Sequence, residues 1–292
     1  MATQREILKR IRSVASTKKI TKTMEMVSTA KMKKMQNKMA MSQPFSKKLD
    51  HIIANLRKSG VEDVFDILLQ ERPNPSKALI LMITGNRGLC GGYNTNVIDK
   101  TLAFKEKLSI EEGKEVLLYN IGKKGHNFLR FIKEPMFKHM PNFDDKLTFD
   151  DALRIGNELI NLFVDEVDEV YISYTKVITS ATQKPEIIRL LPITPEKQDV
   201  EDASAEFHLQ YIFEPNPYKI FQSLLPFYIK VKIYTCLIES GFSEQVARRV
   251  AMKNATDAAT EMVRDLTIRY NRVRQAKITN EIAEIVGGAS AL

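Results

Sequence analysis

A glycine-rich loop is the first place in this sequence where chemistry could be expected. The segment TGNRGLCGGYN follows an apolar run, at the position where a dinucleotide-binding fold holds a pyrophosphate. Its glycines do not follow the GxGxxG spacing, and no GxxxxGK[ST] lysine is present to reach a phosphate. We therefore expect no bound cofactor. The glycines instead supply the backbone angles or close approaches that a tight strand-to-helix turn needs.

The histidines, cysteines and paired aspartates offer no stronger site. Cys90 and Cys236 lack CxxC or metal-ligand spacing, which predicts reduced packing residues rather than a disulfide or a zinc site. Aspartates at 144–145 and 150–151 flank a helix start, where capping is favoured over an acid/base pair. No GxSxG elbow is present, so no catalytic residue is predicted. No metal site is predicted either, because the histidines lack HExxH spacing: His51, His126, His139 and His208.

A long helix is predicted at the start of the chain. Between Thr3 and Gln43 there is neither proline nor glycine, and helical spacing resumes beyond Pro44 until Gly60. Apolar residues recur at intervals of three and four in groups that drift around the helix, which is typical of a helix wrapped against another helix. These residues are Ile7, Ile11, Val14, Ile20, Met24, Val27, Met32, Met35 and Met39.

A second long helix is predicted from Pro217 to Val286. At about 1.5 Å per residue it would extend on the order of 100 Å, which no single compact domain could bury. Its predicted contact face contains small residues that let a partner helix approach closely. That face comprises Ala251, Ala255, Ala258, Met262, Leu266 and Val273.

Between these helices the pattern predicts a Rossmann-like α/β domain, in which buried strands alternate with helices. The fold class is therefore α/β with a long two-helix coiled coil. We expect three parts, at 1–58, 75–213 and 217–292, and a polar surface loop from Thr194 to Ala205. The predicted strands are 77–84, 115–121, 169–174, 186–191 and 207–213, and the predicted helices are 94–108, 123–132 and 150–163.

Basic residues concentrate in the first helix, since residues 1 to 40 carry eleven Lys or Arg against only Glu6 and Glu25. An acidic protein cavity, nucleic acid, an anionic membrane surface or plain solvation would each suit this charge. The same forty residues contain no aromatic side chain, which leaves base stacking unsupported. A nucleic-acid-binding coiled-coil protein remains the alternative function, and an enzyme using the glycine loop is a third. The first twenty residues contain no apolar stretch of the kind that a signal peptide requires. They resemble an Arg-rich mitochondrial presequence in part, but Glu6 and the unbroken helical pattern beyond them favour a structural helix.

Four segments resemble signatures of the gamma subunit family of F-type ATP synthase. They are ITKTMEMVSTAKM, GLCGGYN, ARRVAMKNATDAATEM and the C-terminal NRVRQAKITNEIAEIVGGASAL, and the resemblance spans essentially the whole chain. It implies an antiparallel two-helix rotor shaft without an active site of its own, which turns with the c-ring and drives conformational cycling of the catalytic beta subunits during ATP synthesis and hydrolysis. The implied partners are three alpha and three beta subunits, epsilon and the c-ring, without nucleic acid or a membrane span.

The resemblance also assigns a place in the cell and residue roles. It implies a peripheral protein on the cytoplasmic side of the inner membrane. A bacterial protein is expected rather than a chloroplast one, because residues 194–205 lack the cysteine pair of plant-type chloroplast relatives. Met24 would face beta, and Arg274 with Gln275 would engage a beta catch loop. Without the resemblance, Arg274 and Gln275 would be interpreted as exposed helical residues, and the C-terminal tail IVGGASAL would be interpreted as a frayed terminus. The resemblance makes that tail an apolar bearing tip comprising Ile285, Val286, Ala289 and Leu292.

The register of the coil follows from counting. If the helices leave the α/β domain side by side, the numbers of antiparallel partners should add up to about 275. Met24 then lies opposite roughly Ala251, and Thr3 lies opposite about Arg272. Residues 273–286 have no partner, so we expect about 20 Å of single helix at about 1.5 Å per residue. Such a helix is marginal alone in water and needs an enclosing sleeve.

Overall fold

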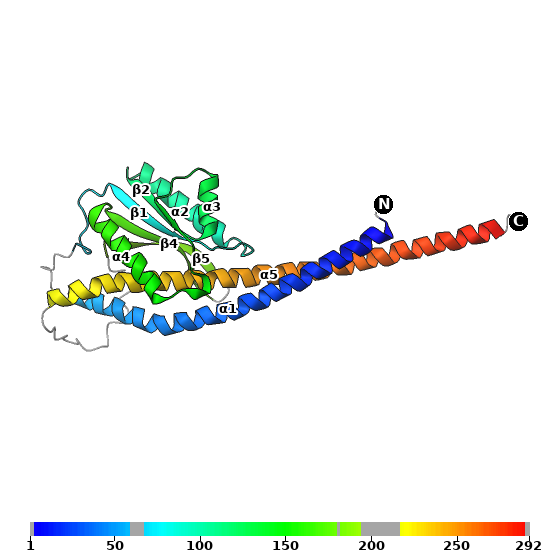
Figure 1. The fold of residues 1–292 in the computed structure, drawn as a ribbon, viewed down its shortest axis with the longest axis horizontal. Coiled ribbons are helices and arrows are strands. Elements are labelled where there is room, and N and C mark those ends of the chain that lie inside the picture. Colours follow the sequence, from blue (N-terminus) through cyan, green and yellow to red (C-terminus); the bar gives the residue numbers. More distant parts are fainter. Residues whose placement is uncertain (1–2, 59–66, 180–181, 194–216, 290–292) are drawn as a thin grey trace. The chain divides into compact units, whose positions relative to one another are not determined.

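Two long helices and a five-stranded sheet make up the described chain. The computed structural model describes residues 3–58, 67–179, 182–193 and 217–289 (Figure 1). Helices α1 (Gln4–Lys58) and α5 (Pro217–Ala289) confirm the two predicted terminal helices. The chain forms two compact units. We call residues 1–30 with 248–292 the coil unit, and residues 31–247 the sheet unit.

The sheet unit contains the predicted α/β fold. Its strand order is β3-β2-β1-β4-β5, with parallel pairing from β3 to β4 and an antiparallel β5 at the other edge. The first two strands are continuous apolar runs because parallel strands are covered on both faces. The strands are β1 (Lys77–Ile83), β2 (Glu115–Ile121), β3 (Lys138–Met140), β4 (Glu169–Val177) and β5 (Gln183–Leu191).

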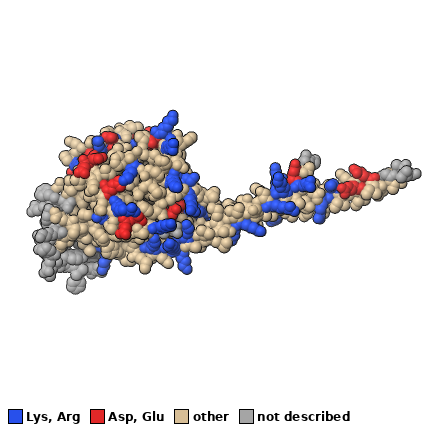
Figure 2. Space-filling model, in the orientation of Figure 1, with Lys and Arg blue, Asp and Glu red and all other residues tan. Residues whose placement is uncertain are grey.

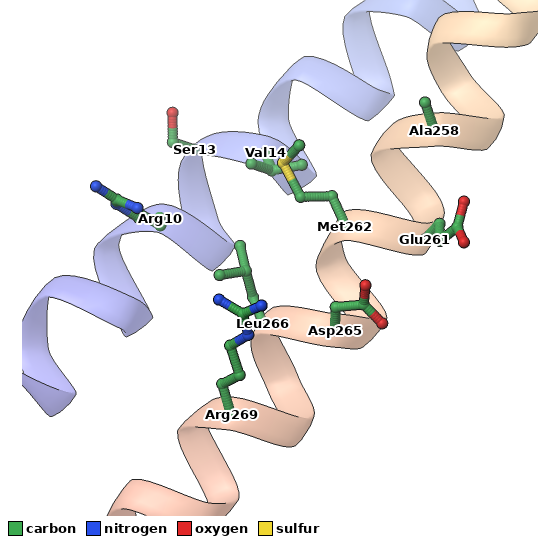
Figure 3. A pocket seen from close by; sticks show the side chains of 9 residues that line it. All are labelled: Arg10, Ser13, Val14, Ala258, Glu261, Met262, Asp265, Leu266 and Arg269. Carbon is green, nitrogen blue, oxygen red and sulfur yellow. The ribbon is translucent and has the colours of Figure 1, made fainter. Parts of the chain in front are cut away.

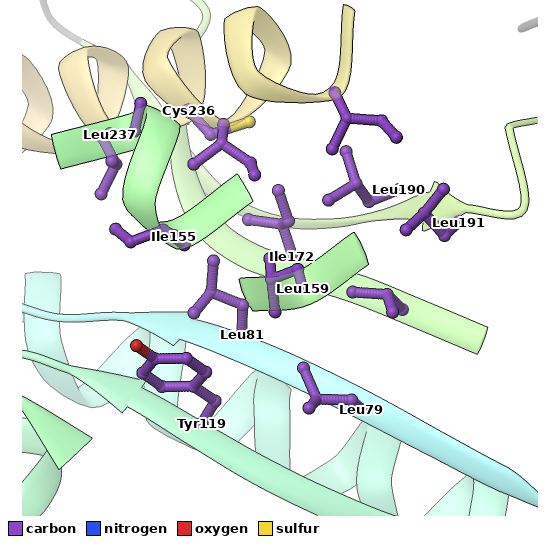
Figure 4. Close-up of a cluster of buried hydrophobic side chains, with 14 of the residues drawn as sticks. Leu79, Leu81, Tyr119, Ile155, Leu159, Ile172, Leu190, Leu191, Cys236 and Leu237 are labelled. Atoms are coloured by element: carbon purple, nitrogen blue, oxygen red, sulfur yellow. The ribbon is translucent and has the colours of Figure 1, made fainter. Parts of the chain in front are cut away.

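Helices cover both faces of this sheet. Helices α2 (Tyr93–Ile110) and α3 (Lys123–Phe131) pack on one face, where Ala78, Ile80 and Met82 point. Helix α4 (Phe149–Asp165) and part of α5 cover the other face, which Leu79 and Leu81 line (Figure 4). The alternation along β1 thus gives the unit one apolar layer above the sheet and one below it.

Some details differ from the sequence prediction. The pattern did not predict β3, because three residues are too few for a periodic signal. The strand expected at 207–213 and the loop expected at 194–205 lie outside the described residues. The capping interpretation of Asp151 is confirmed, since its carboxylate accepts hydrogen bonds from the backbone N–H and the hydroxyl of Thr148.

A buried carboxylate fastens the start of β1. Asp168 accepts hydrogen bonds from the backbone N–H groups of Ser76 (2.6 Å) and Lys77 (2.8 Å), and it forms an ion pair with Arg72 (2.7 Å). Burial opposes ionisation of Asp168, but these donors outweigh it, so the pKa of Asp168 lies below its ordinary value of 3.8. The ionised form therefore stabilises the fold.

Replacing Asp168 by asparagine should lower the free energy of unfolding by about 2–3 kcal/mol at pH 7, because the amide oxygen can still accept from Ser76 and Lys77 but the NH₂ group then faces the Arg72 guanidinium and the ion pair is lost. The contribution of Asp168 is present above its unfolded pKa of about 3.9 and is lost as pH falls through the lower folded pKa. The gap between wild type and Asp168→Asn in urea unfolding should therefore narrow below about pH 4. Exposed Asp165→Asn is the matched control and should change stability by less than about 0.5 kcal/mol.

Candidate functional site in the two-helix coil

The glycine-rich loop of the sheet unit holds helix α5 rather than a ligand. An added Cβ at Gly85 would lie 2.9 Å from the carboxyl carbon of Glu244, which is itself buried on α5. The hydroxyls of Tyr93 and Ser240 are 2.7 Å apart, and both residues are buried. Gly91 has a φ of +56°, which favours glycine. Helix α5 therefore packs directly against the glycine-rich loop through Glu244 and Ser240.

Because Glu244 places a carboxylate at this loop, the isolated chain should not bind ATP through it. A phosphate entering beside Gly85 would meet the carboxyl group of Glu244 and would have to displace a packed helix. Calorimetry of the full chain with MgATP should detect no binding up to millimolar concentration. Micromolar binding that Gly85→Ala abolishes would contradict this interpretation.

Of the remaining candidate residues, His51 is exposed on α1 and His208 lies outside the described residues. Cys90 and Cys236 are both buried free thiols. Burial raises the pKa of the Cys236 thiol, which makes it a poor nucleophile. His126 and His139 stack with ring centroids 4.0 Å apart. Among the residues that the structure describes, no three His, Cys, Asp or Glu side chains are grouped to hold a metal ion.

The coil unit has a regular seam on α1. Ile7 is buried, and the positions that follow at intervals of four and three residues are buried or half-buried up to Ser28. Such spacing is typical of a left-handed two-helix coil. The seam contains polar as well as apolar residues: Ile7, Ile11, Val14, Lys18, Thr21, Glu25 and Ser28.

Helix α5 supplies the complementary seam. Its buried and half-buried positions at the same spacing are Met252, Thr256, Ala259, Val263, Leu266, Tyr270 and Val273, and the predicted contact residues Ala251 and Ala255 beside them are half-buried. The hydroxyl of Thr256 donates to that of Thr21 at 2.8 Å, and the side-chain amide of Gln4 donates to the hydroxyl of Tyr270 at 3.2 Å. These pairs have number sums of 277 and 274, so the predicted antiparallel pairing is confirmed to within about two residues. Met24 consequently lies nearer residue 253 than Ala251.

Several predicted seam residues face outward instead. Ile20 and Val27 are 58% and 51% exposed, while their polar neighbours Thr21 and Ser28 are buried. On α5, Ala258 and Met262 are exposed rather than in the seam. The sequence prediction was wrong here because it followed the apolar side chains, whereas the helices keep a continuous heptad spacing. The coil therefore presents apolar residues on its outer surface.

The residues singled out for partner contact lie at different places along the coil unit. Met24 is half-buried within the paired region, whereas Arg274 and Gln275 are exposed on α5 just beyond the last seam residue, Val273. Ile285 and Val286 are 71% and 60% exposed. Ala289 is exposed at the end of α5, and Leu292 lies outside the described residues. The structure therefore does not bring these residues together into one cluster.

Charge and shape complete the surface of the coil unit. Figure 2 shows Lys and Arg side chains along the two helices. Six basic residues in the part of α1 that belongs to the coil unit are exposed: Arg5, Lys9, Arg10, Arg12, Lys19 and Lys22. A groove of about 490 Å³ opens between the helices, with Val14 and Leu266 among its apolar lining and Arg10, Asp265 and Arg269 among its charged lining (Figure 3). The surface thus combines apolar side chains, positive charge and a hollow, which suits a protein partner.

Known proteins resemble the chain over its full length. A family model described as ATP synthase matches residues 3–292. The ATP synthase gamma chains of Leptospira biflexa and Halothermothrix orenii are 43% and 41% identical, each over 100% of both chains. A rotor chain of the Euglena gracilis mitochondrial ATP synthase has the same fold, with a TM-score of 0.63 at 19% identity, covering 94% of this chain and 98% of that one.

Proposed function

Because the chain belongs to the ATP synthase gamma-chain family, we propose that it is the central rotor shaft of a proton-translocating F-type ATP synthase. Rotation of the c-ring turns the chain, and the chain drives the catalytic beta subunits through their conformational cycle in ATP synthesis and hydrolysis. The chemistry takes place on beta. In the described residues of this chain, the carboxyl group of Glu244 packs against Gly85 of the glycine-rich loop.

The outward apolar residues of the coil unit carry this proposal. Ile20, Val27 and Met262 are each more than half exposed on a two-helix coil that has already buried its own seam. Exposed large apolar side chains that recur along a surface mark a protein interface. A sleeve formed by alpha and beta subunits would cover them, and an acidic inner surface would complement the basic side chains of α1.

We assign partner contacts within this arrangement. Met24 and the pair Arg274 with Gln275 contact beta, and the pair is suited to a polar contact because both side chains are exposed. Beyond Val273 the helix has lost its α1 partner, and its apolar side chains Ile278, Ile282, Ile285 and Val286 are exposed. A single helix of this kind needs an enclosing bearing. Ile285, Val286, Ala289 and Leu292 form the bearing tip in this proposal.

The proposed complex also defines the remaining partner subunits and the location of the chain in the cell. We propose a ring of three alpha and three beta subunits around the coil, with epsilon and the c-ring at the 75–213 domain. The chain then works as a peripheral protein on the cytoplasmic side of the inner membrane, with helices 1–58 and 217–292 as the shaft. Among the described residues, no helix is both long and apolar enough to cross a membrane.

Co-expression of the tagged chain with the alpha and beta subunits of the same organism tests the proposal. The tagged chain should recover both subunits with ATP-hydrolysing activity, and the recovery should fall as salt screens the basic face of α1. The variant Ile20→Asn with Val27→Asn should recover less of the ring while keeping its helical circular dichroism, because both residues are exposed in the free chain. Failure to recover alpha and beta at any salt concentration would overturn the proposal.

A further inference from the structure

Two stacked histidines join the edge strand of the sheet unit to helix α3. His126 lies in α3 and His139 lies in β3, and their ring centroids are 4.0 Å apart with an interplanar angle of 21°. Strand β3 is only three residues long, and its register with β2 places Asn120 beside His139. The stack therefore joins this short edge strand to α3, beside the ladder pairs that join it to β2.

The hydrogen bonds of Asn120 fix the protonation state of this pair. The amide nitrogen of Asn120 donates to the carbonyl of Gly122 at 2.8 Å, and it lies 3.0 Å from Nδ1 of His139. The amide oxygen faces the Thr84 hydroxyl instead. Because an amide NH₂ can only donate, Nδ1 of His139 must carry a lone pair, which makes the ring neutral with its proton on Nε2. A proton added at Nδ1 would break this bond.

The surroundings also disfavour a charged ring. Burial lowers the pKa of His139, and His126 and Lys123 lower it further, while a hydrogen bond with the backbone of Asn120 offsets part of this lowering. Nδ1 of His126 is buried without a hydrogen-bond partner among the described residues. The other charged groups nearby on these elements are engaged or point to solvent. Lys138 pairs with Glu158, Asp144 accepts from Asn86, and Lys124 and Arg130 are exposed.

We propose that His126, His139 and Asn120 form an acid-sensitive latch that holds β3 against β2 and releases it when His139 is protonated. Protonation removes the Asn120 bond and places a cation 4.0 Å from a second imidazole. Since the pKa of His139 is lowered in the fold, the latch is fully stable above the ordinary histidine pKa of about 6.5. It weakens as pH falls below that value, until the folded pKa is passed. This inference is independent of the rotor assignment.

Hydrogen exchange of the full chain between pH 7.5 and pH 5.5 tests the latch. After correction for the intrinsic pH dependence of exchange, the opening of 123–131 and 138–140 should increase by up to about tenfold per pH unit below about pH 6.5. Strand β1 should not respond. His139→Phe should abolish the acid response, because an aromatic ring keeps the stack but cannot be protonated. His51→Phe, at an exposed position on α1, is the matched control and should leave the response intact.

Histidine NMR of the unmodified chain provides a readout that does not depend on a variant folding. One histidine resonance, assigned to His139 through its absence in His139→Phe or through contacts to Asn120, should titrate below the ordinary histidine pKa of about 6.5. Equal acid responses in β1 and β3, an undiminished response in folded His139→Phe, or an ordinary titration of His139 would each overturn the latch.

Discussion

ATP hydrolysis by the assembled complex should fall by about tenfold or more when Arg274 and Gln275 are both replaced by leucine. Both side chains are exposed beyond the last seam residue of α5, so their replacement leaves the packing of the chain intact. In the proposed complex they form polar contacts with a beta subunit at one shaft angle. A charge-assisted hydrogen bond contributes about 1.5–3 kcal/mol, which corresponds to a factor of about ten to a hundred in rate if it acts in the limiting step.

The matched control replaces Asn271 and Arg272 by leucine. These are also an amide and an arginine, and both are exposed one turn earlier on α5. This control should change turnover by less than about twofold, and both complexes should contain one copy of the chain per ring. If the two double variants are equally impaired, the loss reflects the general polarity of the helix. The specific roles of Arg274 and Gln275 would then be rejected.

The sequence was sufficient to predict most of the sheet unit. The apolar runs of β1 and β2 fall in a parallel sheet covered on both faces, where pattern and burial agree. Strand β3 was missed because it is held by pairing with β2 and by the histidine stack, and neither leaves a periodic signal in three residues. Glu244 could not be assigned to the glycine loop, because its contact with Gly85 joins residues far apart in the sequence.

The coil was predicted correctly in its pairing and incorrectly in its seam. The resemblance to a known family implied the antiparallel direction, and the register followed by counting from the helix ends, which proline and glycine mark in the sequence. The seam depends on heptad continuity, and at Thr21 and Ser28 the continuous heptad selects a small hydroxyl residue over the apolar neighbour. Arg274 and Gln275 have no seam position, so only the resemblance to a known family singled them out.

A disulfide between cysteines at Thr21 and Thr256 should form readily and stabilise the coil unit. The two hydroxyl oxygens are 2.8 Å apart in a buried position, so cysteine sulfurs placed there need only a small shift to reach bonding distance. The bond closes a very long loop, and in the chain-entropy model it should raise the free energy of unfolding by up to about 5 kcal/mol. Mild oxidation followed by non-reducing electrophoresis and urea unfolding measures both effects.

Control cysteine pairs at shifted positions test the register of α1 against α5. Met24→Cys with Ala251→Cys, the register expected from counting, is about two residues from the observed one and should crosslink more slowly. Thr21→Cys with Val263→Cys should not crosslink, because seven residues add about 10 Å along α5 and disulfides need Cα atoms within about 7 Å. Crosslinking at 263 but not at 256 would mean that the helices pair in another register.

In the assembled complex the 21–256 disulfide should leave the rate of ATP hydrolysis within about twofold of the reduced protein, since the two helices turn as one body in the proposed rotor. A large loss on oxidation that reduction restores would instead mean that α1 and α5 slide against each other during turnover.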